Sequence, residues 1–199
     1  MKKQLLFLAI TILSFNCYSQ IKFEKGYYIN ISNQKIECLI KNLDWKNNPI
    51  AFKYKLSENS EPKDSNIKAV KEFGIYNVSK YITRTVKIDK SSENFSYMSN
   101  DKNPIFKEEQ LFLKVLVEGK SNLYEYTNSN LIRYFYNIEN SNIEQLIYKS
   151  FKTSDNKVGK NNRFKQQLWN DLKCSTIKTN KVKNLEYNKN SFDYSLVCQ

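Results

Sequence analysis

Cysteine is the most reactive side chain that this sequence offers. Cys174 and Cys198 stand 24 residues apart near the C-terminal end, while Cys38 alternates with Ile36 and Ile40. The chain contains no histidine, so no cysteine has the general base of Cys-His catalysis, and thiols without C-x-x-C spacing make a poor zinc site. We expect a Cys174–Cys198 disulfide worth ~3 kcal/mol in an oxidising compartment. Cys38 is interpreted as a buried structural thiol.

Carboxylates are the second group with catalytic potential. They occur in pairs: Glu108 with Glu109, Glu58 with Glu61, and Asp64 with Glu72. Glycoside hydrolysis needs two carboxylates across one cleft. Adjacent residues of a strand point to opposite faces, so Glu108 and Glu109 cannot both face one substrate if they lie in a strand. Solvated surface charge is the favoured interpretation, and a carbohydrate-active hydrolase that uses two carboxylates is the alternative.

Tyrosines recur at a spacing of two on neighbouring predicted strands: Tyr124, Tyr126, Tyr134 and Tyr136. One interpretation is an exposed aromatic ladder that binds a glycan or a partner segment. The other is a set of half-buried cross-strand pairs that stabilise the sheet. The polar loop over residues 89–104 is the longest in the chain, and it is the second part of the expected contact zone.

Residues 105–151 show how these side chains are positioned. Apolar residues alternate through 111–117, turn residues follow at 119–122 and 127–130, and a further apolar run covers 131–138. Three short strands with polar turns predict an antiparallel meander. The run Ser141-Asn142-Ile143-Glu144 has the pattern of a capping box, and apolar residues follow at helical spacing. It predicts a helix that begins at Ser141.

The rest of the chain extends this pattern. Residues 21–31 and 35–41 predict an opening hairpin, and strands are also expected at 50–56 and 81–88. Residues 65–73 allow one or two helical turns, and apolar spacing within 161–174 predicts a second helix. The expected fold is therefore α+β: an antiparallel sheet of about seven or eight strands over 21–138, curled towards a barrel or sandwich, and a helical C-terminal part.

The first residues have the composition of a secretory signal. Lys2 and Lys3 precede an apolar run over 5–15, and Cys17-Tyr18-Ser19 brings small residues to a cleavage site after Ser19. We expect a signal peptide over 1–19 and one extracytoplasmic domain over 20–199, mainly β in 20–140 and mainly helical in 141–199. An uncleaved anchor and a lipid-modified Cys17 are the alternatives. No other apolar run approaches the ~20 residues of a transmembrane helix.

The net charge of +12 is the main argument for an anionic partner. Arginine occurs only at Arg84, Arg133 and Arg163, and the many lysines are spread along the chain instead of forming one block. Together with abundant asparagine, this is typical of an AT-rich genome, so we do not expect nucleic-acid binding. The four glycines are widely separated and form no phosphate-binding loop, and we expect neither a cofactor nor a metal.

Several stretches together resemble a known family: IKFEKGYYI (21–29), KIECLIKNLDWKNNP (35–49), VKEFGIYNVSKYITRTVKID (70–89), NPIFKEEQLFLKVLVEGKSNLYEY (103–126) and FKQQLWNDLKC (164–174). They are similar to an uncharacterised extracytoplasmic domain of flavobacteria and their Bacteroidota relatives, often found N-terminal to a membrane β-barrel of the outer-membrane type. The resemblance implies export and a place in the periplasm or at the outer membrane. It implies no reaction. Ending at Gln199 without barrel strands, the chain is expected to be a stand-alone or truncated version.

These observations favour a non-enzymatic envelope module that binds a protein or glycan partner. An outer-membrane or other envelope protein is the expected protein partner. The hydrolase with two carboxylates is the alternative enzyme, and a structural spacer for an outer-membrane β-barrel is the third interpretation.

The disulfide gives the first testable prediction. Peptide mapping of the unreduced protein should recover Cys174 and Cys198 in one linked peptide pair, because both thiols meet an oxidising compartment. Recovery of Cys174 freely alkylated would show that the pairing is wrong.

Overall fold

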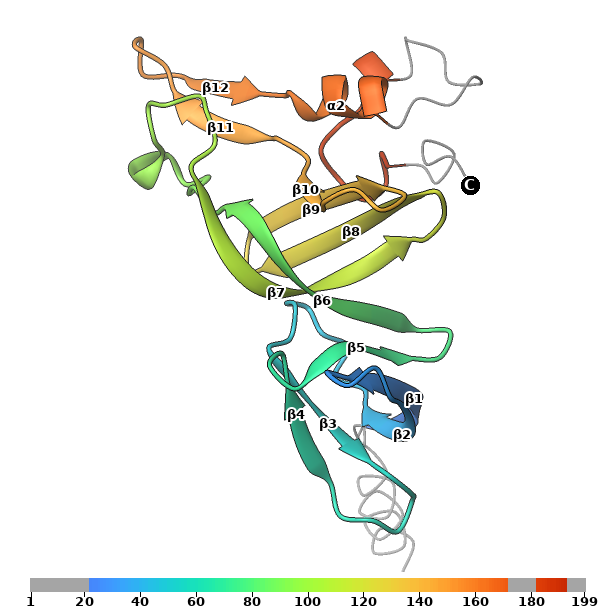
Figure 1. The fold of residues 1–199 in the computed structure, drawn as a ribbon. Helices are drawn as coiled ribbons and strands as arrows, with labels where there is room; N and C mark the ends of the chain where they lie inside the picture. Colours follow the sequence, from blue (N-terminus) through green and yellow to red (C-terminus); the bar gives the residue numbers. More distant parts are fainter. Residues whose placement is uncertain (1–21, 172–181, 193–199) are drawn as a thin grey trace, which may run out of the picture.

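Strands dominate the computed structural model, which describes residues 22–171 and 182–192 (Figure 1). Within these residues one antiparallel sheet contains ten strands in the order β10-β9-β8-β7-β6-β5-β1-β2-β3-β4, and β11 and β12 form a separate hairpin. The first strands are β1 (Phe23–Asn30), β2 (Lys35–Lys41), β3 (Ala51–Lys55), β4 (Lys63–Asn66), β5 (Val70–Ile75) and β6 (Ser79–Asp89). They are followed by β7 (Phe106–Val117), β8 (Ser121–Asn128), β9 (Leu131–Ile138), β10 (Glu144–Gln145), β11 (Lys149–Lys152) and β12 (Val158–Asn161). A 3-10 turn, η2 (Phe95–Tyr97), and helix α2 (Phe164–Asp171) complete the fold.

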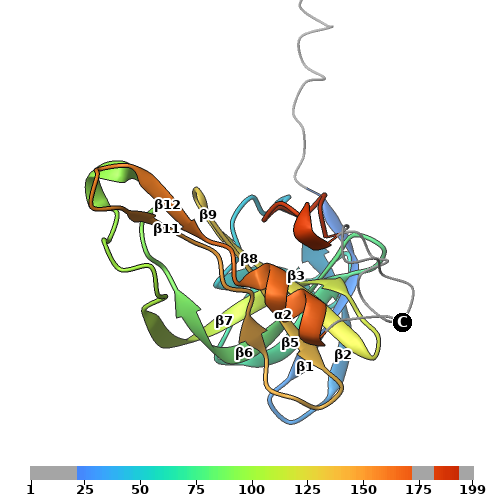
Figure 2. The same cartoon turned by 90° about the horizontal axis from the view of Figure 1, so that it is seen from above.

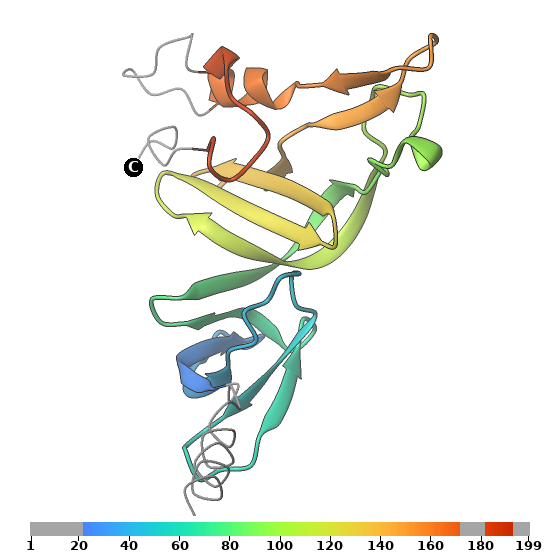
Figure 3. The same cartoon turned by 180° about the vertical axis from the view of Figure 1, so that it is seen from behind.

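The predicted antiparallel sheet and its curl are confirmed, with nine strands in the span where about seven or eight were expected. The opening hairpin is the β1–β2 pair, and the predicted meander is formed by β7, β8 and β9. Figures 1 and 3 show the sheet bending at β6 and β7, with β1–β5 on one side of the bend and the curled half-barrel of β8–β10 on the other. The second predicted helix is confirmed over the eight residues of α2. In Figure 2 this helix lies over β8 and β9.

The helix predicted to begin at Ser141 is wrong. Ser141 closes a turn instead, because its Oγ accepts a hydrogen bond from the Ile138 N–H at 3.0 Å. The chain then pairs with β9, and the Leu146 N–H donates to the Tyr134 carbonyl at 2.8 Å. A short isolated helix is marginal in water, whereas this pairing satisfies main-chain groups and buries Leu146 completely. Tertiary pairing therefore outweighs the local capping signal.

Two further expectations need correction for the same reason. Residues 63–66 and 70–75 are the strands β4 and β5, and no helical turn replaces them. The sequence predicts a mainly helical part after residue 140, yet 144–161 contributes three strands. Alternation of polar and apolar residues in such short segments does not separate a strand from a helical turn.

Three apolar clusters form the core. The first lies under the N-terminal strands and contains Phe52, Phe73 and Phe112. The second fills the inside of the curl with residues such as Val86 and Phe135. The third lies between the outside of β8–β9 and the C-terminal part, and it joins Leu123, Tyr134 and Tyr136 to Phe164, Leu168 and Phe192. The half-barrel is thus packed on both faces.

Asn48 holds the sheet together where β7 and β8 separate. The register between these strands ends at Lys114↔Glu125. Beyond it the Asn48 side chain donates to the Phe112 carbonyl at 2.6 Å and to the Glu125 carbonyl at 3.1 Å, and accepts from the Thr127 N–H at 2.9 Å. Its own N–H donates to the Thr127 carbonyl at 2.8 Å. One asparagine therefore replaces the missing ladder rungs.

Substitution of Asn48 should destabilise the fold. Asn48→Ala leaves two carbonyls and one N–H without a partner, so we expect a loss of about 2–4 kcal/mol in the free energy of unfolding. Asn47 is the matched control, because its side chain accepts one exposed hydrogen bond from Ser129, and Asn47→Ala should cost less than about 1 kcal/mol. Urea denaturation of both variants measures the difference, and equal losses would contradict the assigned role.

Candidate seam between two strand edges

The four tyrosines do not form an exposed ladder. Tyr124, Tyr126, Tyr134 and Tyr136 are between 1% and 7% exposed, so the expectation of an exposed aromatic ladder is wrong. Tyr124 and Tyr126 pack inside the curl, whereas Tyr134 and Tyr136 lie under the C-terminal part. The Tyr124 hydroxyl donates to Asn137 Oδ1 at 2.9 Å, and burial raises the pKa of Tyr124 to about 12. The curl and the C-terminal cover bury both faces of β8 and β9, which the period-two pattern could not reveal.

Cys38 is buried and free, as predicted for a structural thiol. Burial raises the pKa of its thiol to about 12, so the reactive thiolate is scarce at neutral pH. Cys174 and Cys198 lie outside the described residues, and their pairing stays a prediction.

The adjacent carboxylates are separated, as strand geometry predicts. Glu109 forms an ion pair with Lys90, while Glu108 lines a cavity of about 570 Å³. The predicted long loop between β6 and β7 begins beside this cavity and carries η2.

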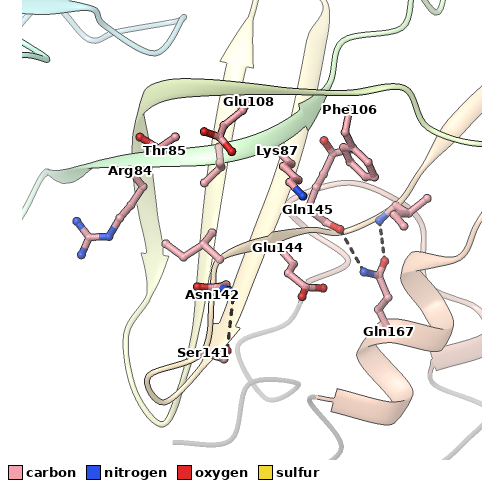
Figure 4. Close-up of a pocket in the computed structure, with 13 residues that line it drawn as sticks. Arg84, Thr85, Lys87, Phe106, Glu108, Ser141, Asn142, Glu144, Gln145 and Gln167 are labelled. Carbon is pink, nitrogen blue, oxygen red and sulfur yellow. Dashed lines mark hydrogen bonds between the residues drawn. The ribbon is translucent and has the colours of Figure 1, made fainter.

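The cavity lies in a seam between β6 and β10. Arg84, Thr85 and Lys87 of β6 line one side, and Glu144 and Gln145 of β10 line the other. Figure 4 shows Arg84 and Thr85 towards one end of this space and Lys87 and Gln145 towards the other. No strand of the described chain pairs with β10 on this side, because the sheet order ends there.

The seam is closed at one end by a buried contact. The Asp89 N–H donates to Gln145 Oε1 at 2.8 Å, with Asp89 0% and Gln145 3% exposed. The amide Nε2 of Gln145 is buried and has no hydrogen-bond partner among the described residues. A buried donor without an acceptor costs about 1–3 kcal/mol, and Asp89 Oδ2 is likewise a buried acceptor without a partner among the described residues.

Arg133 fixes β6 at this closed end. Its side chain is fully buried, and Nε donates to the Asp89 carbonyl at 2.8 Å. Nη1 forms an ion pair with Glu93 at 2.8 Å, and Nη2 donates to the Ser91 carbonyl at 3.3 Å. A buried guanidinium is tolerated only when its donors are paired. The start of the long loop is thereby held on β9.

Gln167 of α2 occupies the outer edge of β10 at the same end. Its Oε1 accepts from the Ile147 N–H at 2.8 Å, and its Nε2 donates to the Gln145 carbonyl at 3.2 Å (Figure 4). A side-chain amide thus acts here as the peptide group of a neighbouring strand would. At this point the edge of β10 is therefore already bonded to an amide group of the same chain.

The β6 edge is unpaired along the cavity. The pairing with β5 ends at Glu72↔Ile82, while the pairing with β7 continues to Asp89↔Phe106. Alternate residues of an antiparallel ladder direct their main-chain groups to opposite sides. Because the Asp89 N–H points away from β7 to Gln145, the N–H and C=O groups of Lys87 and Thr85 also point away from β7. They face the seam, and no strand of the described residues pairs with them.

The described residues contain no cluster of three or more His, Cys, Asp or Glu side chains placed to bind a metal ion. Over the same residues, no helix has the length and apolar character needed to span a membrane.

Comparison with known proteins gives no relative. No family model matches the chain, and the searches of curated proteins and of solved structures find no significant match. The flavobacterial resemblance therefore stays a prediction.

Removal of the Gln167 amide should open the closed end of the seam. Gln167→Ala leaves the Ile147 N–H and the Gln145 carbonyl without these partners. We therefore expect the free energy of unfolding to fall by about 1–2 kcal/mol and hydrogen exchange at the Ile147 amide to become faster. Gln166 is the exposed neighbour on the same helix, and Gln166→Ala should leave both quantities unchanged. Unaltered exchange at Ile147 in Gln167→Ala would contradict the bridging role.

Proposed function

We propose that this chain is an exported, non-enzymatic binding module that holds a segment of a partner protein in the seam between β6 and β10. The observation that carries the proposal is the cavity of about 570 Å³ beside a buried Gln145 amide without an acceptor. Its volume falls within the range of specific ligand sites. Arg84, Lys87, Glu108 and Glu144 give its rim charges of both signs, which suits a polypeptide with mixed side chains better than a uniformly anionic partner.

The setting of this function comes from the sequence. The N-terminal signal pattern and the flavobacterial resemblance support a place in the periplasm or at the outer membrane, so the segment is expected to come from an envelope protein. We assign the fold to the α+β class, in which the half-barrel provides the site and the C-terminal helix closes one end of it. The buried tyrosines support the core, and the proposal gives them no part in binding.

A bulky side chain in the cavity should prevent binding. The binding is tested with a peptide selected from a displayed library of short random sequences. Asn142 is exposed and lines the cavity, so Asn142→Trp should lower the affinity for this peptide by about tenfold or more. Asn140 is exposed in the same turn and lies outside the lining, so Asn140→Trp is the matched control and should bind as the wild type does. Titration calorimetry measures both. Failure to select any peptide, or equal binding by both variants, would overturn the proposal.

A second candidate function is glycan hydrolysis. It is favoured by one observation, that Glu108 and Glu144 line the same cavity from different strands, as a pair of catalytic carboxylates would. Both residues are exposed, whereas the acid of a glycosidase typically lies in an apolar pocket. Release of reducing ends from envelope glycans by the wild type, abolished in Glu108→Gln and in Glu144→Gln, would establish this candidate in place of the binding module.

A further inference from the structure

We infer that the bound segment is an extended strand that runs antiparallel to both β6 and β10 and completes a six-stranded barrel. The inference rests on the proposed function and specifies the shape and direction of its ligand. It follows from strand direction, from the unpaired main-chain groups and from the pattern of side chains along the seam.

Strand direction decides which way the segment runs. Each strand from β6 to β10 is antiparallel to the next, so β6 and β10 are parallel to each other across the seam. A single strand placed between them is antiparallel to both, and the resulting barrel is antiparallel throughout. A segment that ran parallel to β6 and β10 would pair with them slightly less stably per residue than an antiparallel one.

Main-chain groups supply the rungs on the β6 side. The N–H and C=O groups of Thr85 and Lys87 face the seam, as the direction of the Asp89 N–H requires. An extended segment of about four residues spans the roughly 10 Å from Arg84 to Lys87. It would form there the hydrogen bonds that β5 forms with the earlier part of β6.

The β10 side offers matching groups. The Leu146 N–H points to β9, so the main-chain groups of Ile143 and Gln145 point to the opposite side, the side of the seam. At the closed end the Gln145 carbonyl is already bonded to the Gln167 amide. Farther from the closed end, the Ile143 carbonyl remains for the segment.

Side chains along the seam define the preferred sequence. Val86 is buried inside the curl and Ile143 packs against the same cluster, so residues of the segment that point inward meet an apolar surface. Thr85 and Lys87 alternate with Val86 and are exposed. Residues that point outward meet these side chains and the charged rim. The segment is therefore expected to alternate apolar and polar residues.

Proline at one edge position tests the strand mode. Thr85→Pro removes an N–H that the ladder with β7 does not use, and proline is tolerated at such edge positions. Thr85→Pro should lower the affinity for the selected peptide by about tenfold or more. Thr85→Val retains the N–H, so its affinity should stay within about twofold of that of the wild type. Gln110 lies opposite Thr85 on β7 and directs its N–H to the other edge, so Gln110→Pro is a second control that should not weaken binding.

The two proposals fail in different ways. If Asn142→Trp prevents binding but Thr85→Pro and Thr85→Val bind equally, the strand mode is wrong and the seam remains the site. If no peptide binds, both proposals fall. Circular dichroism and thermal unfolding show whether Thr85→Pro still folds. If it does not, hydrogen exchange at the Thr85 and Lys87 amides of the wild-type protein is the deciding measurement. Slower exchange of these amides when the peptide is bound supports the strand mode, and unchanged exchange overturns it.

A spin label on the peptide tests the direction. A segment antiparallel to β6 has its N-terminus near Lys87 and its C-terminus near Arg84. A label at the C-terminus should therefore broaden the NMR signals of Arg84 and Asn142, and a label at the N-terminus those of Lys87 and Gln145. The reverse pattern would overturn the inferred direction.

Discussion

The main-chain ladder between β6 and β7 connects every other part of the sheet. Its register runs from Tyr81↔Lys114 to Asp89↔Phe106. β5 pairs with β6, and β8 pairs with β7, at the same end of this ribbon. The other end extends beyond both neighbours, so within the described residues no strand pairs with its two outer edges. Because unpaired N–H and C=O groups are costly when buried, the structure must satisfy or expose each of them.

Side-chain amides satisfy some of these groups. Asn48 bonds to the main chain of β7 and β8 where the strands separate, and Gln145 and Gln167 do the same at the closed end of the seam. The outermost strand, β4, is instead short and exposed and carries the ion pair of Asp64 with Lys53, a common protection against edge-to-edge pairing. The main-chain groups of Thr85 and Lys87 have no such amide partner among the described residues, and they face a cavity. This contrast is the physical basis for placing a ligand strand there.

The sequence predicted the parts of the fold that depend on local pattern. Alternation identified β7–β9 and the opening hairpin, and helical spacing identified α2. It could not identify the closure of the sheet, because the pairing of Gln145 with Asp89 joins residues 56 apart in sequence. The capping box at Ser141 predicts a helix, so the sequence gives no indication that Gln145 and Gln167 are site residues. Tyr124 and Tyr134 were correctly placed on strands, but the cover that buries them lies elsewhere in the chain.

Amide hydrogen exchange in the protein without ligand tests the central claim most directly. If the β6 edge is open along the seam, protection should alternate: Val86 and Ile88, bonded to β7, should exchange slowly, and Thr85 and Lys87 should exchange fast. NMR detection resolves the four amides individually. Uniformly slow exchange across all four would mean that the edge is already paired, and it would contradict the open seam on which the proposed function depends.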